Sequence, residues 1–502
     1  MHKATLLLTV LLTAAQLQAG DIVVAPGENL HDALRQAREW RRTADPRCDG
    51  GITIHLKGGR HQIDEPLFIR PEDSGTEASP TIIRGEEGAT LCGDPPQQHT
   101  QLFPKEGMER LLGFDTAQRT ITIPTPPRDV LRQRNVEMVV HQRWAIAILR
   151  VKAFHVEGGR TTVTFMEPES RLEFEHPWPQ PVIDGERGSS SFLLRTTEQR
   201  RGVERLVIVA GAEHTPVRHV TFENITFADA CWNRPLDKGH VTLQGGFPII
   251  DAYKLKKEGL PWAATLENQA WVERPVAAVS VSWAEHVNFR GCTFTRLAST
   301  ALDYTTGISD CTIEGNTFTH IGGTAIMAGS FAESPREVHR PYSDLARLCQ
   351  RLVVRGNHIS DASCEDWGAV AIGCGYVRET TIDSNEVSDV NYSGICVGWG
   401  WTPLYTGMEH NHITRNHVER YARQLYDAGG IYTLSNQPGS LIQGNLIEPP
   451  SPAPYATNDR GFHIYLDAET DGYTIEGNTS QGRPIGKEQT GFNHPGPQVI
   501  FK

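Results

Sequence analysis

From about residue 216 onward, one short pattern recurs along the chain: a hydrophobic residue, two variable residues, Asn, one variable residue and a second hydrophobic residue. The segments that carry this pattern or a close variant are 221–227, 288–294, 312–318, 353–359, 381–387, 409–418, 441–447 and 474–480. The marker residues, Asn or its equivalent, are Cys292, Asn316, Asn357, Asn385, Asn416, Asn445 and Asn478. Their intervals of 24, 41, 28, 31, 29 and 33 residues fit one coil of a solenoid plus a variable loop.

Each marker is followed by a second short apolar run that reads as a strand. These runs are 300–304, 324–327, 368–372, 394–397, 430–433 and 463–467. Stacked coils of this kind predict parallel sheets, with the Asn of each coil hydrogen bonded along the axis to the Asn above and below. A β-sandwich or a propeller with Asn in its turns is the alternative. We predict an all-β fold, a right-handed parallel β-helix, because the markers share one internal pattern.

The remaining regions predict an N-terminal cap and an insertion. Leu30, Ala33, Leu34, Ala37 and Trp40 fall at helical spacing. We therefore expect a capping helix and the first coils over residues 20–94, since strand-like runs separated by Gly, Pro and Asp follow the helix. Residues 95–210 are less regular and contain β-rich patches such as 137–149, which predicts an inserted β-rich subdomain. The main parallel β-helix is expected over 211–502.

The first residues are typical of a secretory signal peptide. Lys3 precedes an apolar run over 4–15, and small residues follow near Ala19. A buried N-terminal helix is the alternative. We expect residues 1–19 to be removed on export to the periplasm or the extracellular space. No later run of 18 apolar residues is present in the sequence, so we expect no membrane partner.

The charge balance argues against nucleic-acid partners. The 502 residues include 48 Lys and Arg against 60 Asp and Glu, a net charge of −12, and contain no long basic run. The nine Cys form no CxxC pair, so we expect no zinc site and no other metal or cofactor. Most of these Cys are expected to be small buried side chains, although a disulfide or two remains open in an exported protein. A monomer is expected.

Side-chain alternation along the second strands predicts which residues point away from the core. We align the strands on the inward residues Leu302, Ile326, Val370, Ile395, Ile431 and Ile464. The next position outward then holds Asp303, Met327, Ala371, Cys396, Tyr432 and Tyr465. This alignment predicts a floor that is small and open in its middle, with aromatic rings and carboxylates at its C-terminal coils. Such a floor has the shape of a groove for a flat ligand.

The same coils supply candidate substrate-binding side chains. Trp399, Trp401, Tyr432 and Tyr465 can offer ring faces to pyranose sugars, and His463 can supply a polar contact. Ordinary packing is the alternative for each aromatic residue. His141 and Trp144 of the inserted subdomain could also reach the groove, but the sequence does not place them.

Three segments, 392–401, 426–439 and 463–467, carry a family resemblance. The chain resembles secreted β-helix carbohydrate-active enzymes, and in particular glycoside hydrolase family 141, which includes α-L-fucosidases and xylanases. The resemblance covers most of the mature chain and is strongest from about 380 to 470. It implies that the catalytic acids fall on Asp427 and Asp467, which occupy the matching motif positions.

The chemistry sets a condition on these acids. Glycoside hydrolysis uses two carboxyl groups about 5–5.5 Å apart for retention or about 6.5–9.5 Å apart for inversion. Asp427 lies four residues before its aligned Ile, and Asp467 lies three residues after its own. An extended strand at about 3.3 Å per residue would separate them too far. The turn before Gly429 must therefore bend Asp427 over the groove.

Two further carboxylates are weaker candidates. In our alignment Asp366 shares the register of Asp427 two coils away, roughly 10 Å at about 4.8 Å per coil, which suits an inverting pair. Asp303 points outward but lies three or four coils from the aromatic residues, and we expect it to have a structural role. The order of candidates is Asp427, Asp467, Asp366 and Asp303, and a turn cap is the alternative for each.

We expect an exported glycoside hydrolase that acts on oligosaccharides or polysaccharides of plant cell walls or similar glycans. A polysaccharide lyase is the first alternative, and it would need a Lys, Arg or Tyr base together with cations that neutralise a uronate. Unsaturated products and calcium dependence would favour it. A non-catalytic glycan-binding solenoid is the second alternative, favoured by sugar binding without turnover. The fold alone does not choose among the three.

Overall fold

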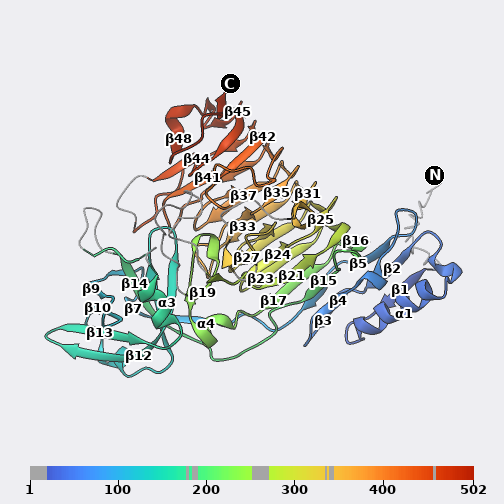
Figure 1. Ribbon diagram of the computed structural model, residues 1–502. Coiled ribbons are helices and arrows are strands. Elements are labelled where there is room, and N and C mark those ends of the chain that lie inside the picture. Colours follow the sequence, from blue (N-terminus) through green and yellow to red (C-terminus); the bar gives the residue numbers. More distant parts are fainter. Residues whose placement is uncertain are drawn as a thin grey trace, which may run out of the picture.

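The computed structural model describes residues 20–176, 180–183, 190–251, 271–333, 336–337, 344–455 and 460–502. Three sheets of mainly parallel strands run side by side along a stack of coils, which confirms the predicted parallel β-helix (Figure 1). Among the described residues, no helix is long and apolar enough to cross a membrane. The predicted signal peptide, residues 1–19, lies outside the described residues.

The three sheets are named A, B and C. Sheet A contains β1 Asp21–Val24, β2 Ile52–Leu56, β5 Thr81–Gly85, β16 Val217–Glu223, β22 Ala284–Arg290, β26 Thr312–Glu314, β32 Val353–Arg355, β36 Thr381–Asp383, β39 His412–Thr414, β42 Asn436–Gln443, β45 Asp471–Glu476 and β49 Ile500–Phe501, with β25 Ile308–Ser309, β31 Cys349–Gln350 and β35 Val377–Arg378 beside this path. Sheet B contains β3 Gly59–Gln62, β6 Ala89–Cys92, β17 Thr226–Ala230, β23 Thr293–Leu297, β27 Thr317–Ile321, β33 His358–Ala362, β37 Glu386–Val390, β40 His417–Glu419, β43 Leu446–Ile447, β46 Thr479–Ser480 and β47 Arg483–Pro484. Sheet C, which carries the candidate site, contains β4 Leu67–Ile69, β15 Val207–Ala210, β21 Ala277–Ser282, β24 Thr300–Tyr304, β28 Ile326–Ala328, β34 Ile372–Cys374, β38 Ile395–Val397, β41 Ala428–Thr433, β44 Gly461–Leu466 and β48 Thr490–Phe492.

An antiparallel sheet lies beside this stack and belongs to the insertion (Figure 1). Its strands are β7 His99–Phe103, β8 Glu109–Arg110, β9 Gly113–Asp115, β10 Thr120–Pro124, β11 Val136–His141, β12 Ile146–Glu157, β13 Arg160–Phe165, β14 Ser191–Thr197 and β18 His240–Val241. Short helices, α2 Arg128–Leu131, α3 Glu169–Glu175 and α4 Arg234–Lys238, accompany it. A further small sheet is formed by four short strands, β19 Ile249–Asp251, β20 Trp271–Val272, β29 Ala332–Glu333 and β30 Arg336–Glu337.

The N-terminal helix α1 spans Leu30–Arg42 and lies at the first coils (Figure 1). Its N-cap, Asn29, accepts a hydrogen bond from the backbone N–H of His31 at 2.9 Å, which satisfies one of the donors that every helix start leaves free. The buried face consists of the five residues that the helical spacing identified: Leu30, Ala33, Leu34, Ala37 and Trp40. The predicted capping helix is therefore confirmed.

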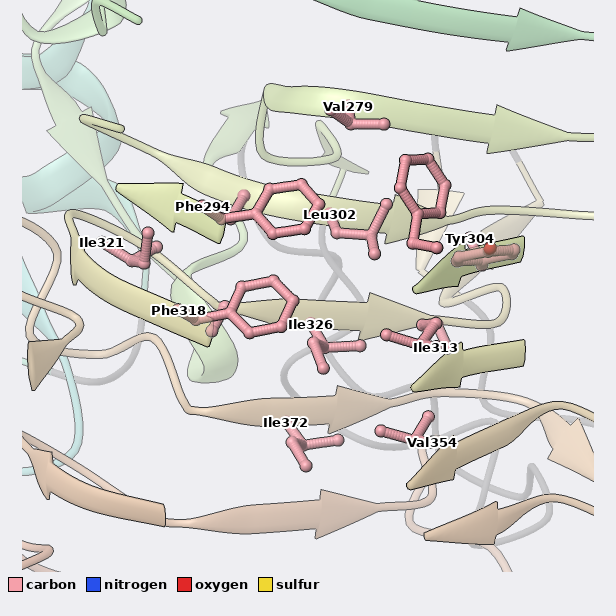
Figure 2. Close-up of a cluster of buried hydrophobic side chains, with 14 of the residues drawn as sticks. Val279, Phe294, Leu302, Tyr304, Ile313, Phe318, Ile321, Ile326, Val354 and Ile372 are labelled. Carbon is pink, nitrogen blue, oxygen red and sulfur yellow. The ribbon is translucent and has the colours of Figure 1, made fainter. Parts of the chain in front are cut away.

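Inward side chains stack from coil to coil and form the core. The rings of Phe294 and Phe318 lie one above the other, 4.6 Å between centroids and 4° from parallel (Figure 2). Leu302 and Ile326, aligned in sheet C, are both fully buried, as the alternation predicts. Parallel register places like residues above one another, so each coil buries its apolar face against the next.

The marker Asn residues form the predicted ladder. Each side-chain amide nitrogen donates to the amide oxygen of the next marker, at 2.9 Å from Asn316 to Asn357 and 2.9 Å from Asn357 to Asn385. The series continues through Asn416 and Asn445 to Asn478. The same amide oxygens also accept hydrogen bonds from the backbone N–H of the preceding marker. One buried Asn side chain therefore pairs with polar groups of the coils on both sides of its own.

All nine Cys are free, so no disulfide contributes to this fold. Burial raises the pKa of several thiols, to about 12 for Cys292, which makes them unreactive packing groups.

Candidate active site

Asp427 lies at a sharp bend immediately before β41. Its backbone φ is +62°, a left-handed conformation that Asp tolerates better than most residues. The bend is held on both sides, because the N–H of Tyr426 donates to the carbonyl of Arg143 at 3.3 Å and the N–H of Ala428 donates to that of Arg460 at 3.1 Å. The hydroxyl of Tyr392 donates to the carbonyl of Asp427 itself at 3.0 Å. The bend that the carboxylate geometry required is therefore present.

The Asp427 carboxyl group is partly screened from water, with 21% of its side chain exposed. It accepts a hydrogen bond from the hydroxyl of Tyr465 at 3.1 Å, and the guanidinium of Arg460 lies 3.6 Å away. Burial raises the pKa of Asp427 above its ordinary value, and the negative charge of Asp467 raises it further. The pKa of Asp427 is thus raised overall, although the nearby Arg460 lowers it.

Asp467, directly after β44, has a different environment. Its Oδ2 accepts hydrogen bonds from the Tyr432 hydroxyl and from Trp401 Nε1, the latter at 3.2 Å, and its Oδ1 accepts one from Asn493 Nδ2 at 2.6 Å. Only 7% of the residue is exposed. These three donors hold the Asp467 carboxylate in one orientation.

The parallel register brings the two acids together. Tyr432 on β41 is paired with Tyr465 on β44, and their rings meet edge to face with centroids 5.2 Å apart. Tyr432 on β41 donates to Asp467, which follows β44. Tyr465 on β44 donates to Asp427, which precedes β41. Burial raises the pKa of Tyr465 and of Tyr432, so both hydroxyls stay protonated and act as donors.

A side chain outside the repeat links the two halves of this arrangement. Gln244 Nε2 donates to the hydroxyl of Tyr392 at 3.0 Å and to that of Tyr432 at 2.9 Å. The amide therefore connects the tyrosine that holds the backbone of Asp427 to the tyrosine that holds the carboxylate of Asp467. Sequence reasoning missed Gln244, Asn493 and Arg460, because all three lie in connections where strand periodicity gives no signal.

The two candidate tryptophans have different surroundings. Trp401 holds Asp467 through its indole N–H. Trp399 packs against Phe247, Phe331 and Trp401, with ring centroids 4.8–5.3 Å apart, and only 5% of it is exposed. Trp399 thus contributes to the apolar packing above sheet C.

His463 is not brought to the carboxylates. Its Nε2 is 3.0 Å from the hydroxyl of Ser480 on β46, a strand of sheet B. Gly430 on the adjacent strand β41 packs against Ile447. A Cβ atom added to Gly430 would lie 2.4 Å from a methyl carbon of Ile447. His463 therefore contacts sheet B through Ser480.

The alignment of one coil was wrong. Ile326 pairs with Ile372, not with Val370, so the outward position in that coil is Gly373 and not Ala371. Asp366 starts a turn in which the N–H of Gly368 returns to its carboxylate at 3.1 Å, and this turn uses residues that we counted as strand. Val370 and Ile372 are both buried and lie two positions apart, so hydrophobicity could not separate the two registers.

Asp366 consequently does not share the register of Asp427. Its Oδ2 is 2.8 Å from Nε2 of His240, and both side chains are buried. Asp303 forms a bidentate ion pair with Arg274, with both contacts at 2.6 Å, and is 2% exposed. The structure therefore brings together Asp427 and Asp467 and places the other two carboxylates elsewhere.

The expected open floor is covered. Met327 and Tyr432, both predicted to line it, are 1% and 3% exposed because side chains of the insertion and of Phe247, Phe331 and Leu348 pack over sheet C as a second apolar cluster. Hollows among the described residues include a cleft of about 210 Å³ that is lined in part by Asp366 and a cavity of about 40 Å³ that reaches Tyr432. Neither is lined by Asp427 or Asp467, so the larger hollow does not coincide with the paired acids.

His141 of the insertion reaches the segment that precedes Asp427. Its Nε2 lies 3.0 Å from the carbonyl of Gln424, and its ring packs against Tyr426 and Tyr455 at 6.0 and 5.5 Å. Burial lowers the pKa of His141 to about 4, so the ring is neutral and donates to that carbonyl. The insertion thereby takes part in placing Asp427.

Comparisons with known proteins agree with this architecture. Residues 98–200 match the model of the GH141 insertion domain. A solved structure described as a glycoside hydrolase is 31% identical, the alignment covers 96% of each chain, and the TM-score is 0.88. No curated protein matches the chain with significance.

More distant structures are also found. XylC in complex with xylose is 11% identical over 86% of this chain and 66% of its own, with a TM-score of 0.41. The surface protein and adhesin PfbA of Streptococcus pneumoniae is 11% identical over 95% and 98%, with a TM-score of 0.37. Both scores are too low to carry an argument.

Proposed function

Because the chain belongs to glycoside hydrolase family 141, we propose that it hydrolyses glycosidic bonds with Asp427 as the general acid and Asp467 as the second carboxylate. Because the chain belongs to a hydrolase family, we prefer a hydrolase to the two alternatives, a polysaccharide lyase and a non-catalytic glycan-binding solenoid. A glycan substrate follows from that membership.

The observation that carries this assignment is the contrast between the two carboxyl groups. Burial and the charge of Asp467 raise the pKa of Asp427, whereas Tyr432, Trp401 and Asn493 donate hydrogen bonds to Asp467. Glycoside hydrolysis needs two carboxyl groups in different surroundings, and here the pKa of Asp427 is raised while three donors hold Asp467 in place. Asp427 would protonate the leaving oxygen, and Asp467 would attack the anomeric carbon or activate a water molecule.

The neighbouring side chains support these roles. Tyr465 and Arg460 can stabilise the Asp427 carboxylate after it has released its proton, because both already contact its Oδ1. Tyr432 and Trp401 fix the orientation of Asp467 through its Oδ2. Held in this way, the acids need little reorganisation during the reaction.

The substrate proposal follows the family resemblance. We expect an α-L-fucosidase-like or xylanase-like activity on plant cell-wall or similar complex glycans. The apolar run and small residues at the N-terminus support export to the periplasm or the extracellular space.

The test is hydrolysis of aryl-fucosides, aryl-xylosides and cell-wall oligosaccharides by the wild type and by Asp427→Asn and Asp467→Asn. Each substitution should lower kcat/KM on the oligosaccharides by about 10²–10⁴-fold, the usual contribution of an acid–base group. Asp389→Asn, a carboxylate on sheet B paired with Arg420, is the matched control and should keep wild-type activity. Unchanged hydrolysis in both Asp427→Asn and Asp467→Asn would refute the assignment.

A further inference from the structure

The cleft of about 210 Å³ lies between two structural units. On one side are α4 and β18, the latter paired with β12 of the insertion, and on the other are the turns of sheet C at Ser299 and Thr324. Ligand sites form preferentially at such junctions. The cleft is far larger than the roughly 10–15 Å³ that one water molecule needs, so it has room for a small polar ligand.

A buried polar pair forms part of the wall. His240 Nε2 and Asp366 Oδ2 are 2.8 Å apart, and His240 is 1% exposed. Burial lowers the pKa of His240, which favours a neutral ring that donates from Nε2 to the carboxylate. Its Nδ1 is then a hydrogen-bond acceptor.

Residues that line this cleft retain unmet hydrogen-bonding groups. His240 Nδ1, Thr300 Oγ1 and Arg234 Nε are buried and have no partner among the described residues. Thr300 is 1% exposed, like His240. Native proteins rarely leave such groups unpaired, and each one calls for a partner such as an ordered water or a bound molecule, which small side-chain shifts would let it reach. The three groups together require both a donor and acceptors.

The charges of the lining are balanced. Among the described lining residues, four carboxylates stand against four guanidinium or ammonium groups. One pair is direct, with Arg234 Nη1 2.5 Å from Glu273 Oε2. A balanced lining gives no net attraction to an anion or a cation. Hydroxyl groups, which donate and accept at once, match both the unmet atoms and the charge balance.

The cleft lies on the same outward face of sheet C as the paired acids. It shares Gly245 and Thr324 with the small cavity, which extends to Tyr432, the residue that donates to Asp467. The coils at Thr324 and Tyr432 are separated by three strand steps, from β28 through β34 and β38 to β41, or about 14 Å at roughly 4.8 Å per step. A site at this distance can hold a different sugar unit from the one that reacts.

We propose that the cleft between the insertion and sheet C, formed around the His240–Asp366 pair, is a second sugar-binding site that holds an uncharged unit of the same glycan. The identity of the glycan rests on the proposed function, whereas the presence of the site does not. Asp366 in this account binds and orients a sugar and takes no part in bond cleavage.

The binding experiment uses the full chain carrying Asp427→Asn and Asp467→Asn, so that bound sugars stay intact. L-fucose, xylotetraose and a fucosylated xyloglucan oligosaccharide are titrated by calorimetry into this protein and into versions that also carry Ser299→Trp or Thr295→Trp. Ser299 lines the cleft, and Thr295 lies in the same coil on sheet B. We expect at least one oligosaccharide to bind, Ser299→Trp to weaken it at least tenfold, and Thr295→Trp to leave it unchanged.

Two additional measurements keep the outcome clear. The same oligosaccharide should shift the Nδ1 resonance of His240, recorded in protein with ¹⁵N-labelled histidine, and Ala369→Leu serves as a second filling variant if Ser299→Trp does not fold. Binding that both filling variants leave intact, a His240 signal that does not move, or no binding by any of the three sugars would overturn the proposal. Loss of aryl-glycoside hydrolysis in Asp366→Asn alone would also overturn it, since the cleft would then be the reaction centre. Failure of the proposed function is separate, because it appears as absence of hydrolysis by the wild type.

Discussion

At the residue scale, the proposed chemistry depends on the unequal surroundings of Asp427 and Asp467. The Asp467 carboxylate has three protein donors, whereas Asp427 combines partial burial with a nearby negative charge that raises its pKa. A general acid must stay protonated until the leaving group departs, so a raised pKa extends the working range of Asp427 toward neutral pH.

The charge of Asp467 can be tested directly as a cause of this shift. In Asp467→Asn the neighbouring charge is gone, so the pKa of Asp427 should fall below its wild-type value, although burial still keeps it raised. The measurement is a pH titration of the ¹³C carboxyl resonance of Asp427 in the two proteins. In the wild type, kcat/KM should decline as the pH rises through the same pKa, because the acid form is then lost. An unchanged titration in Asp467→Asn would mean that the two groups are not coupled.

At the element scale, the repeat made sheet positions predictable and left the connections undefined. The hydrophobic pattern and the marker Asn residues identified the strands, their inward faces and the ladder, since period-2 alternation fixes which side chains are buried. It failed at Val370 and Ile372, where a turn at Asp366 displaces the strand by two residues without changing the buried face. The bend at Asp427 was inferred only as a requirement of the chemistry, because the left-handed residue that produces it leaves no periodic signal.

The Asn ladder should contribute most where an Asn has neighbours on both sides. Asn385→Ala would remove the acceptor for Asn357 and the donor to Asn416, leaving several buried groups unsatisfied. At about 1–3 kcal/mol for each such group, the free energy of unfolding should fall by several kcal/mol. Asn478→Ala, in the last coil of the ladder, loses two hydrogen bonds from Asn445 and one to the carbonyl of Ile442 but none to a further Asn, so it should cost somewhat less. Urea denaturation of both variants provides the comparison, and equal losses would argue against cooperation along the ladder.

At the scale of the whole molecule, the insertion changes what sheet C can do. The sequence pattern predicted the inserted β-rich segment and the outward-facing residues of sheet C. It could not show that the insertion packs over these residues, because contacts between distant segments leave no periodic pattern in the sequence. For the same reason the repeat pattern did not predict the contacts of Gln244 with Tyr392 and Tyr432. It also did not predict the contact of His141 with the segment before Asp427. The structure brings together Asp427 and Asp467, the two acids that the family resemblance implied, and their catalytic role stays a prediction.

Because His141 is buried against the carbonyl of Gln424, the free energy of unfolding should depend on pH in the acid range. Its pKa is lowered to about 4 in the folded protein, whereas the unfolded chain binds the proton near pH 6.5. The unfolded state therefore binds more protons between these values, so stability falls as the pH is lowered from about 6.5 to 4, by up to about 3 kcal/mol. His141→Gln should show a shallower decline in the free energy of unfolding over this range. Parallel pH profiles for the two proteins would exclude His141 as the source.

The most direct test of the central claim is the leaving-group dependence of Asp427→Asn. A dinitrophenyl glycoside of the sugar that the wild type releases needs little protonation at the bond that breaks, whereas the natural glycan needs a full proton transfer. If Asp427 is the general acid, its replacement should lower kcat/KM by about 10²–10⁴-fold on the glycan and far less on the dinitrophenyl substrate. The same loss on both substrates, or no loss on either, would contradict the account.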